Sequence, residues 1–151
     1  MNRRERPAGR QLSRSDHPAE AATSCPFCSP PVDHVLIERP LAFVKRDGYP
    51  LTKGHSLVIP RRHVATFFET TNEERRAMLE LLDEAKVLLD REHGPDGYNI
   101  GINNGVAAGQ TVMHVHLHVI PRYLGDTSDP RGGIRWIFPE NGTLGDCPLR
   151  R

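Results

Sequence analysis

The sequence predicts an α+β domain in which an antiparallel five-stranded sheet packs with one long and one short helix. Two observations support this: five short runs of apolar or β-branched residues, and one long segment with apolar residues at helical spacing. A third is their order, three strands, a helix and two strands, which favours an antiparallel sheet over regularly alternating parallel units.

The first three strands are expected at residues 34–39, 41–47 and 55–60. Their sequences, "HVLIER", "LAFVKRD" and "HSLVIP", are short and apolar, and the first two lie close enough for a hairpin. Pro60 should end the third strand because proline has no amide hydrogen for the ladder. The following residues, 61–69, are expected to form the short helix.

The long helix is expected at residues 72–93. A capping box at its start is formed either by Thr71 with Glu74 or by Thr70 with Glu73. The segment "GPDG" should end it. One apolar stripe at helical spacing marks its buried face: Met78, Leu81, Leu82, Ala85, Leu88 and Leu89.

Two further strands are expected at residues 98–103 and 114–120, joined by a glycine-containing loop. Side chains alternate along a strand, so His114, His116 and His118 should share one polar face. The residues between them should pack on the long helix: Val115, Leu117 and Val119.

The composition indicates one domain without a membrane or nucleic-acid partner. The chain has 151 residues and a formal net charge of +1, and no apolar run approaches the roughly 20 residues that span a bilayer. We expect a disordered basic arm at residues 1–23, the domain at 24–125, and a C-terminal loop and tail at 126–151. The first residues lack the apolar core of a secretory signal, which favours a cytoplasmic protein.

Three histidines at alternate positions indicate either a metal site or catalysis by an imidazole. The preceding loop offers neutral hydrogen-bond donors for phosphate oxygens, namely glycine amides, Asn103, Gln110 and Thr111. This loop is not a Walker A motif, so a P-loop nucleotidase is excluded. The motif "CPFC", with Cys25 and Cys28, favours metal binding over a redox pair, although two buried thiols are a further interpretation.

These residues resemble the histidine triad family of nucleotide hydrolases and transferases. The family signature alternates three histidines with apolar residues, and residues 114–120 read "HVHLHVI". The resemblance includes "GQT" before the triad, "TKGHSLVIPRRH" at residues 52–63 and "CPFC", and so covers about residues 25–122. It implies a HIT-like fold, and family members of this size are commonly homodimers.

The resemblance also implies roles for individual residues. His116 would be the nucleophile, His118 would hydrogen-bond near the scissile phosphate, and His55 would support the nucleophile. The substrate-binding residues would be Asp47 for the ribose hydroxyls and Asn103, Gln110 and Thr111 for the phosphate oxygens. In many bacterial members of the family, two cysteines and two histidines bind structural zinc, which here implies Cys25, Cys28, His63 and His114 as ligands.

The resulting hypothesis is a nucleotide hydrolase that cleaves dinucleoside polyphosphates or nucleoside phosphoramidates at the α-phosphate through a nucleotidyl-histidine. The resemblance also allows Mg²⁺ to accompany the substrate. Two alternatives are a phosphorylase that uses phosphate as acceptor, and a zinc-stabilised nucleotide-binding module with little catalysis.

Overall fold

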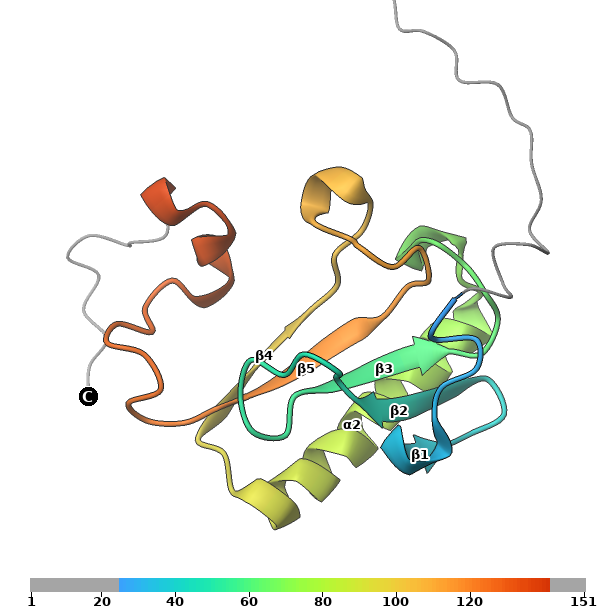
Figure 1. Cartoon of the computed structure of the whole chain (residues 1–151), viewed down its shortest axis with the longest axis horizontal. Helices are drawn as coiled ribbons and strands as arrows, with labels where there is room; N and C mark the ends of the chain where they lie inside the picture. The colour runs from blue at the N-terminus through green and yellow to red at the C-terminus, as the bar shows by residue number, and fades with distance from the viewer. Residues whose placement is uncertain (1–24, 142–151) are drawn as a thin grey trace, which may run out of the picture.

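The computed structural model describes residues 25–141 and contains the predicted five-stranded antiparallel sheet (Figure 1). The strands are β1 (Val35–Glu38), β2 (Ala42–Arg46), β3 (Ser56–Pro60), β4 (Gly97–Gly101) and β5 (Leu117–Arg122), in the spatial order β1-β2-β3-β5-β4. The predicted arm, residues 1–23, and residues 142–151 of the predicted tail lie outside the described residues. No helix within residues 25–141 is long and apolar enough to cross a bilayer.

The long helix α2 (Asn72–His93) has the predicted boundaries. Its capping box uses Thr71 and Glu74: the Thr71 hydroxyl accepts from the Glu74 amide at 3.2 Å, and the Glu74 carboxylate accepts from the Thr71 amide at 2.8 Å. The helix ends at Gly94, whose φ of 56° places it in the left-handed region that glycine adopts readily. Both ends are therefore determined by local sequence signals.

Replacing Thr71 with alanine should lower the free energy of unfolding by about 1 kcal/mol, because the amides of the first turn lose their capping acceptor. Urea denaturation measures this change, with the exposed Thr127→Ala as the matched control. Equal stabilities of the two variants would contradict the assigned cap.

The main core lies between α2 and one face of the sheet (Figure 1). The predicted stripe of α2 contributes four fully buried side chains, and β5 contributes two of the three apolar residues predicted for this face. They pack with β2 and β3 in one cluster: Ala42, Val44, Val58, Met78, Leu81, Ala85, Leu89, Leu117 and Val119.

Two predicted elements differ from the structure. The short helix expected at residues 61–69 is only a 3-10 turn, Phe67–Glu69, because the backbone of both flanking threonines is extended. The last strand starts at Leu117 rather than at residue 114, so two of the three histidines precede it. Pro60, at the end of β3, has no amide hydrogen to continue the pairing, and its carbonyl accepts a hydrogen bond from the ring of His114 at 2.8 Å.

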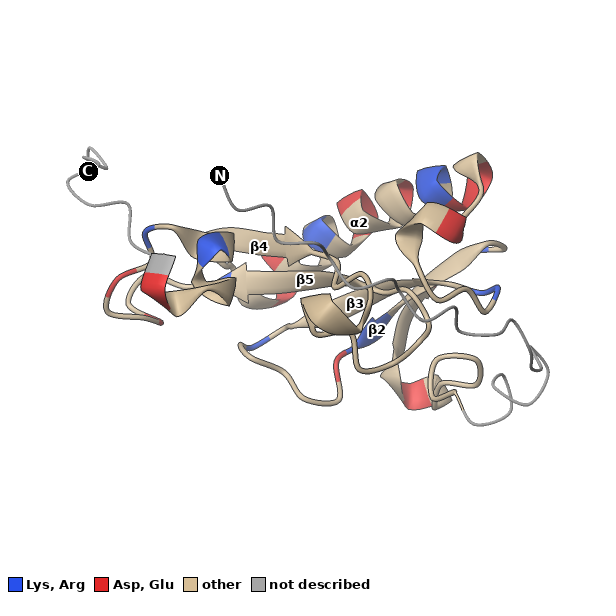
Figure 2. Ribbon diagram, turned by 90° about the horizontal axis from the view of Figure 1, so that it is seen from above, with Lys and Arg blue, Asp and Glu red and all other residues tan. Residues whose placement is uncertain are grey.

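After β5, the predicted C-terminal loop contains two further 3-10 helices, Gly133–Ile137 and Pro139–Asn141. In Figure 2 this segment lies at the end of the sheet that carries β4 and β5. The first of the two packs against β4. Its Ile134 side chain lies so close to Gly101 that a Cβ added to this glycine would be only 3.3 Å away. This segment therefore borders the sheet edge formed by β4.

Candidate functional site

The predicted catalytic histidines meet on the sheet face opposite α2, which we call the triad face. His118 comes from β5, His116 precedes that strand, and His55 lies immediately before β3. The ring centroids of His116 and His118 are 4.9 Å apart, and those of His55 and His118 are 5.2 Å apart. The predicted single polar surface of three histidines is wrong, because His114 and His116 are both buried and His114 turns toward the cysteines.

The tautomer of His116 is set by a main-chain group. Its Nδ1–H donates to the carbonyl oxygen of His114 at 2.8 Å. A neutral imidazole carries one ring hydrogen, so the other nitrogen, Nε2, keeps a free lone pair. Such a nitrogen can attack phosphorus without first losing a proton.

A second hydrogen-bond chain sets the tautomers of His55 and His118. The amide of Leu51 donates to His55 Nδ1 at 3.2 Å, so neutral His55 carries its hydrogen on Nε2. That hydrogen points to His118 Nδ1, 3.0 Å away, which leaves the hydrogen of His118 on its own Nε2. His116 therefore presents a lone pair, whereas His118 presents a hydrogen-bond donor.

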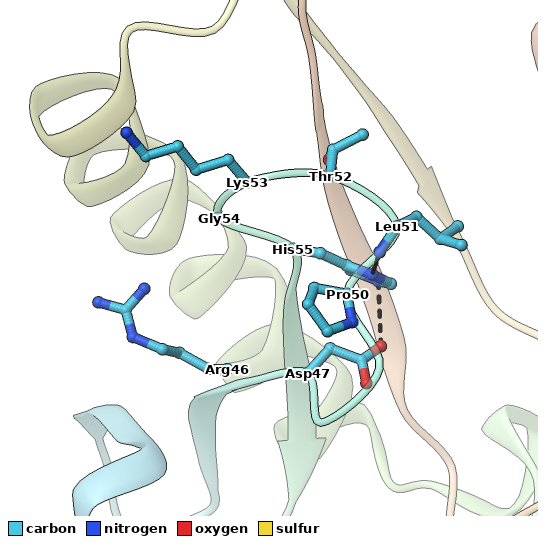
Figure 3. Close-up of a pocket in the computed structure, with 8 residues that line it drawn as sticks. All are labelled: Arg46, Asp47, Pro50, Leu51, Thr52, Lys53, Gly54 and His55. Atoms are coloured by element: carbon cyan, nitrogen blue, oxygen red, sulfur yellow. Dashed lines mark hydrogen bonds and ion pairs between the residues drawn. The ribbon is translucent and has the colours of Figure 1, made fainter. Parts of the chain in front are cut away.

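Asp47 lies beside His55, the first histidine of this hydrogen-bonded series (Figure 3). Its Oδ2 is 3.3 Å from His55 Nε2 and 3.9 Å from His118 Nδ1, and its Oδ1 accepts from the amide of Tyr49 at 3.0 Å. The loop from residue 46 to residue 55, which carries Asp47, lines a cavity of about 410 Å³ beside His55. Asp47 is thus placed where a ligand entering beside the histidines would meet it.

The His118 imidazole should stay neutral down to about pH 5, because burial, His116 and His55 lower its pKa from 6.5 to about 4 against the opposing effect of Asp47. The unfolded chain takes up this proton near pH 6.5, so the native state loses stability as the pH falls from 6.5 toward 4. An NMR titration of the ring protons, with the His118→Gln variant to assign the signal, measures this pKa. A His118 signal that titrates near pH 6.5 would contradict the assignment.

The predicted phosphate-binding residues all lie on the loop between β4 and β5 but differ in availability. Gln110 is buried, and its amide donates to the carbonyls of Ala65 at 2.7 Å and Val112 at 3.0 Å while accepting from the Gly105 amide at 2.7 Å. Both donor hydrogens of Gln110 are used within the protein, so its observed role is to hold this loop. The remaining two are more accessible, Asn103 being half-buried and Thr111 exposed.

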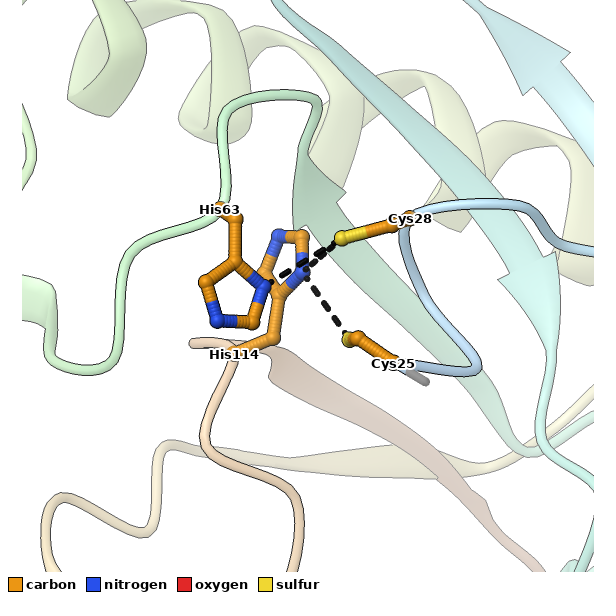
Figure 4. Close-up of side chains that lie close together, drawn as sticks. All are labelled: Cys25, Cys28, His63 and His114. Carbon is orange, nitrogen blue, oxygen red and sulfur yellow. Dashed lines mark hydrogen bonds between the residues drawn. The ribbon is translucent and has the colours of Figure 1, made fainter. Parts of the chain in front are cut away.

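The four predicted metal ligands, Cys25, Cys28, His63 and His114, converge at one point (Figure 4). Their donor atoms all lie within 4.8 Å of one another. Cys28 Sγ is 3.2 Å from His63 Nδ1 and 3.7 Å from His114 Nδ1, and Cys25 Sγ is 3.5 Å from His114 Nδ1. Sulfur and nitrogen bound tetrahedrally to one zinc ion are about 3.5 Å apart, so this donor set fits zinc.

The orientation of His114 also fits a metal ligand. Its Nε2–H donates to the carbonyl oxygen of Pro60, which leaves the lone pair of Nδ1 directed at the cysteines. A hydrogen bond from the second ring nitrogen is the usual support of a metal-binding histidine. His114 thus joins the two halves of the site, because its ring faces the cysteines and its carbonyl holds the ring of His116.

A second set of groups, Asp47, His55 and His118, is also compact enough for a metal ion. The tautomers argue against this use. His55 Nδ1 accepts from the Leu51 amide, so His55 Nε2 carries a hydrogen and has no lone pair for a metal. This set is better described as a hydrogen-bonded chain.

Phe27, which lies between the two cysteines, belongs to the site although its sequence context predicted no role for it. Its ring centroid is 5.0 Å from that of His116 and 6.0 Å from that of His114. The ring therefore contacts the candidate nucleophile edge to face. Its position inside the "CPFC" motif was the one signal that could have indicated this contact.

The HIT domain family model matches residues 31–125 of the chain. The chain belongs to the HIT, or histidine triad, family. The match contains all three triad histidines, His55 and His63, whereas Cys25 and Cys28 precede it.

Known HIT proteins resemble the chain in sequence and fold. A Zn-bound histidine triad protein of Mycobacterium smegmatis is 35% identical, with a TM-score of 0.64 over 72% of this chain and 81% of that one. The diadenosine triphosphate hydrolase of Plasmodium falciparum, solved with cyclomarin A, is 26% identical with a TM-score of 0.62, over 66% and 67% of the two chains. The AP-4-A phosphorylase of Mycobacterium tuberculosis is 30% identical to this chain. The matched region covers 82% of this chain but only 64% of that protein.

Proposed function

We propose that this HIT protein is a nucleotide hydrolase that cleaves dinucleoside polyphosphates or nucleoside phosphoramidates at the α-phosphate and releases a nucleoside monophosphate. The observation that carries the proposal is the bond from His116 Nδ1 to the His114 carbonyl, which leaves His116 Nε2 as a free nucleophile beside the donor of His118. The named activities of the phosphorylase and hydrolase relatives, both directed at dinucleoside polyphosphates, support the same substrate class.

The reaction proceeds in two displacements. His116 Nε2 attacks the α-phosphorus, a P–N bond forms, and the bond from phosphorus to the leaving group breaks. A phosphate leaving group departs as an anion, whereas an amine departs with a proton taken from water. In the second step water attacks the same phosphorus, gives up its proton to solvent, and returns His116 to its neutral form.

His118 and the loop between β4 and β5 stabilise the transferred group. His118 Nε2–H donates a hydrogen bond near the scissile bond. Asn103, Thr111 and the backbone amides of the loop hold the phosphate oxygens, while Gln110 keeps that loop in shape. Asp47 accepts hydrogen bonds from the ribose hydroxyls. With His55 and His118 neutral, the oxygens are held by uncharged donors.

Zinc bound by Cys25, Cys28, His63 and His114 would have four protein ligands and no open position for substrate. Its contribution is structural: it fixes His114, whose carbonyl in turn orients His116. No step of the reaction needs to pass through the metal.

The test is to incubate the protein with adenosine 5′-phosphoramidate and, separately, with diadenosine tri- and tetraphosphate, and to resolve the products by chromatography. Release of AMP supports the hydrolase. If added phosphate yields a nucleoside diphosphate, the chain is a phosphorylase, the alternative that the Mycobacterium tuberculosis relative favours. Absence of turnover with every substrate would overturn the proposal in favour of a nucleotide-binding module.

A further inference from the structure

Lys45 is a buried cation that the proposed reaction does not use. Only 6% of its surface is exposed, and lysines are rarely so buried without a carboxylate partner. Within residues 25–141 its ammonium forms no ion pair, and the contact it makes is with the ring of Phe27, whose centroid lies 5.5 Å from Nζ. A cation kept in this position has hydrogen-bond donors to offer a ligand.

Lys45 lies on the triad face. Its neighbours in β2, Ala42 and Val44, belong to the core beneath α2, and side chains alternate along the strand. Across the sheet Lys45 pairs with Leu57, and Leu57 pairs with His118. Paired residues of neighbouring antiparallel strands point to the same face, so the side chains of Lys45 and His118 lie on the same face of the sheet. Their strands are separated by β3, which places the two backbone positions roughly 10 Å apart.

Phe27 connects this lysine with the nucleophile. The same ring that contacts Nζ of Lys45 lies 5.0 Å from the ring of His116, centre to centre. In the described part of the chain, the side-chain polar atoms that are fully buried and lack a hydrogen-bond partner are the two ring nitrogens of His93. The Lys45 ammonium is not among these atoms, so it retains contact with solvent. A ligand bound beside Phe27 can therefore reach it.

The sheet order indicates which part of a nucleotide would lie near Lys45. The phosphate-binding loop follows β4, which lies beyond His118 on the side away from β2. Asp47 lies two residues after Lys45 in the same extended segment, about 7 Å along it. With the α-phosphate at His116 and the ribose at Asp47, as the proposed function requires, the nucleoside extends toward β2 and its base approaches Lys45.

We propose that Lys45 reads the base and selects 6-oxopurine nucleotides over adenine nucleotides. A lysine ammonium has three donors and no acceptor. Guanine presents two acceptors, O6 and N7, on one edge, whereas adenine presents N7 beside the amino group N6, whose hydrogens would face the ammonium. We therefore expect guanosine monophosphate to bind about tenfold more tightly than adenosine monophosphate.

The test is calorimetric titration of GMP and AMP into the wild type, Lys45→Met, Lys45→Arg and Lys86→Met. Methionine removes the donors while keeping an unbranched side chain, and arginine restores donors. Lys86 lies on α2, on the other side of the sheet, and its replacement is the matched control. Thermal denaturation checks that each variant is folded.

The proposal predicts that the preference for GMP disappears in Lys45→Met and persists in Lys45→Arg and Lys86→Met. Equal affinity of the wild type for the two nucleotides, or a preference that survives Lys45→Met, would overturn it. Binding of a monophosphate requires no turnover, so this result is independent of whether the chain is a hydrolase. For an active enzyme, kcat/KM for guanosine and adenosine 5′-phosphoramidates should change in the same ratio.

Discussion

His116→Asn should abolish turnover, lowering kcat by at least about a thousandfold, because asparagine has no nitrogen that can form the covalent intermediate. The fold and the zinc content should remain unchanged, since the ring of His116 is not among the proposed metal ligands. The measurements are AMP release under single-turnover conditions, thermal denaturation, and zinc content by mass spectrometry.

A matched control is His34→Asn, which removes a half-exposed imidazole before β1. This variant should retain full activity. The wild type, quenched during turnover, should also carry a nucleotidyl group on His116, and two displacements should retain the configuration at phosphorus. Substantial activity of His116→Asn, or inversion at phosphorus, would exclude His116 as the nucleophile.

Loss of the metal should have the second large effect. Cys28→Ser should abolish the binding of one zinc ion per chain and lower the melting temperature by about 10 °C or more, because zinc binding by such ligands contributes directly to folding. Activity should fall with it, since His114 and Phe27 both contact His116. The third cysteine of the chain, Cys147, provides the matched control as Cys147→Ser.

A chelator at a concentration that removes zinc from the wild type should reproduce the lowered melting temperature of Cys28→Ser. Adding zinc back should restore the wild type but not the variant. A protein that contains no zinc when purified from zinc-supplemented cells, or whose melting temperature is unaffected by the chelator, would contradict the assigned metal site.

The elements that local sequence determines were predicted well. The bounds of α2 follow from the capping box at Thr71 and from Gly94, both of which act within one helical turn. The strands were located to within a few residues, because runs of β-branched residues and alternation are local signals too. The spacing of "HVHLHVI" also predicted correctly that Leu117 and Val119 face the helix.

The features that depend on distant neighbours were predicted poorly. β5 starts only at Leu117, and the ring of His114 before it binds the carbonyl of Pro60, more than fifty residues away in sequence. The internal bonding of Gln110 involves Ala65, and the buried Lys45, for which no prediction was made, contacts Phe27. No periodicity within the sequence encodes such contacts, which exist only once the sheet has formed.

Three of the site's tautomers are imposed directly by main-chain atoms: the amide of Leu51 sets that of His55, and the carbonyls of His114 and Pro60 set those of His116 and His114. Substitution of a side chain does not remove a backbone carbonyl, and only proline removes an amide hydrogen. The residue at position 51 can therefore vary freely during evolution, provided that it is not proline, without disturbing the protonation pattern. Exchange of its exposed side chain gives the protein a means of changing what the neighbouring cavity accepts while the chemistry stays the same.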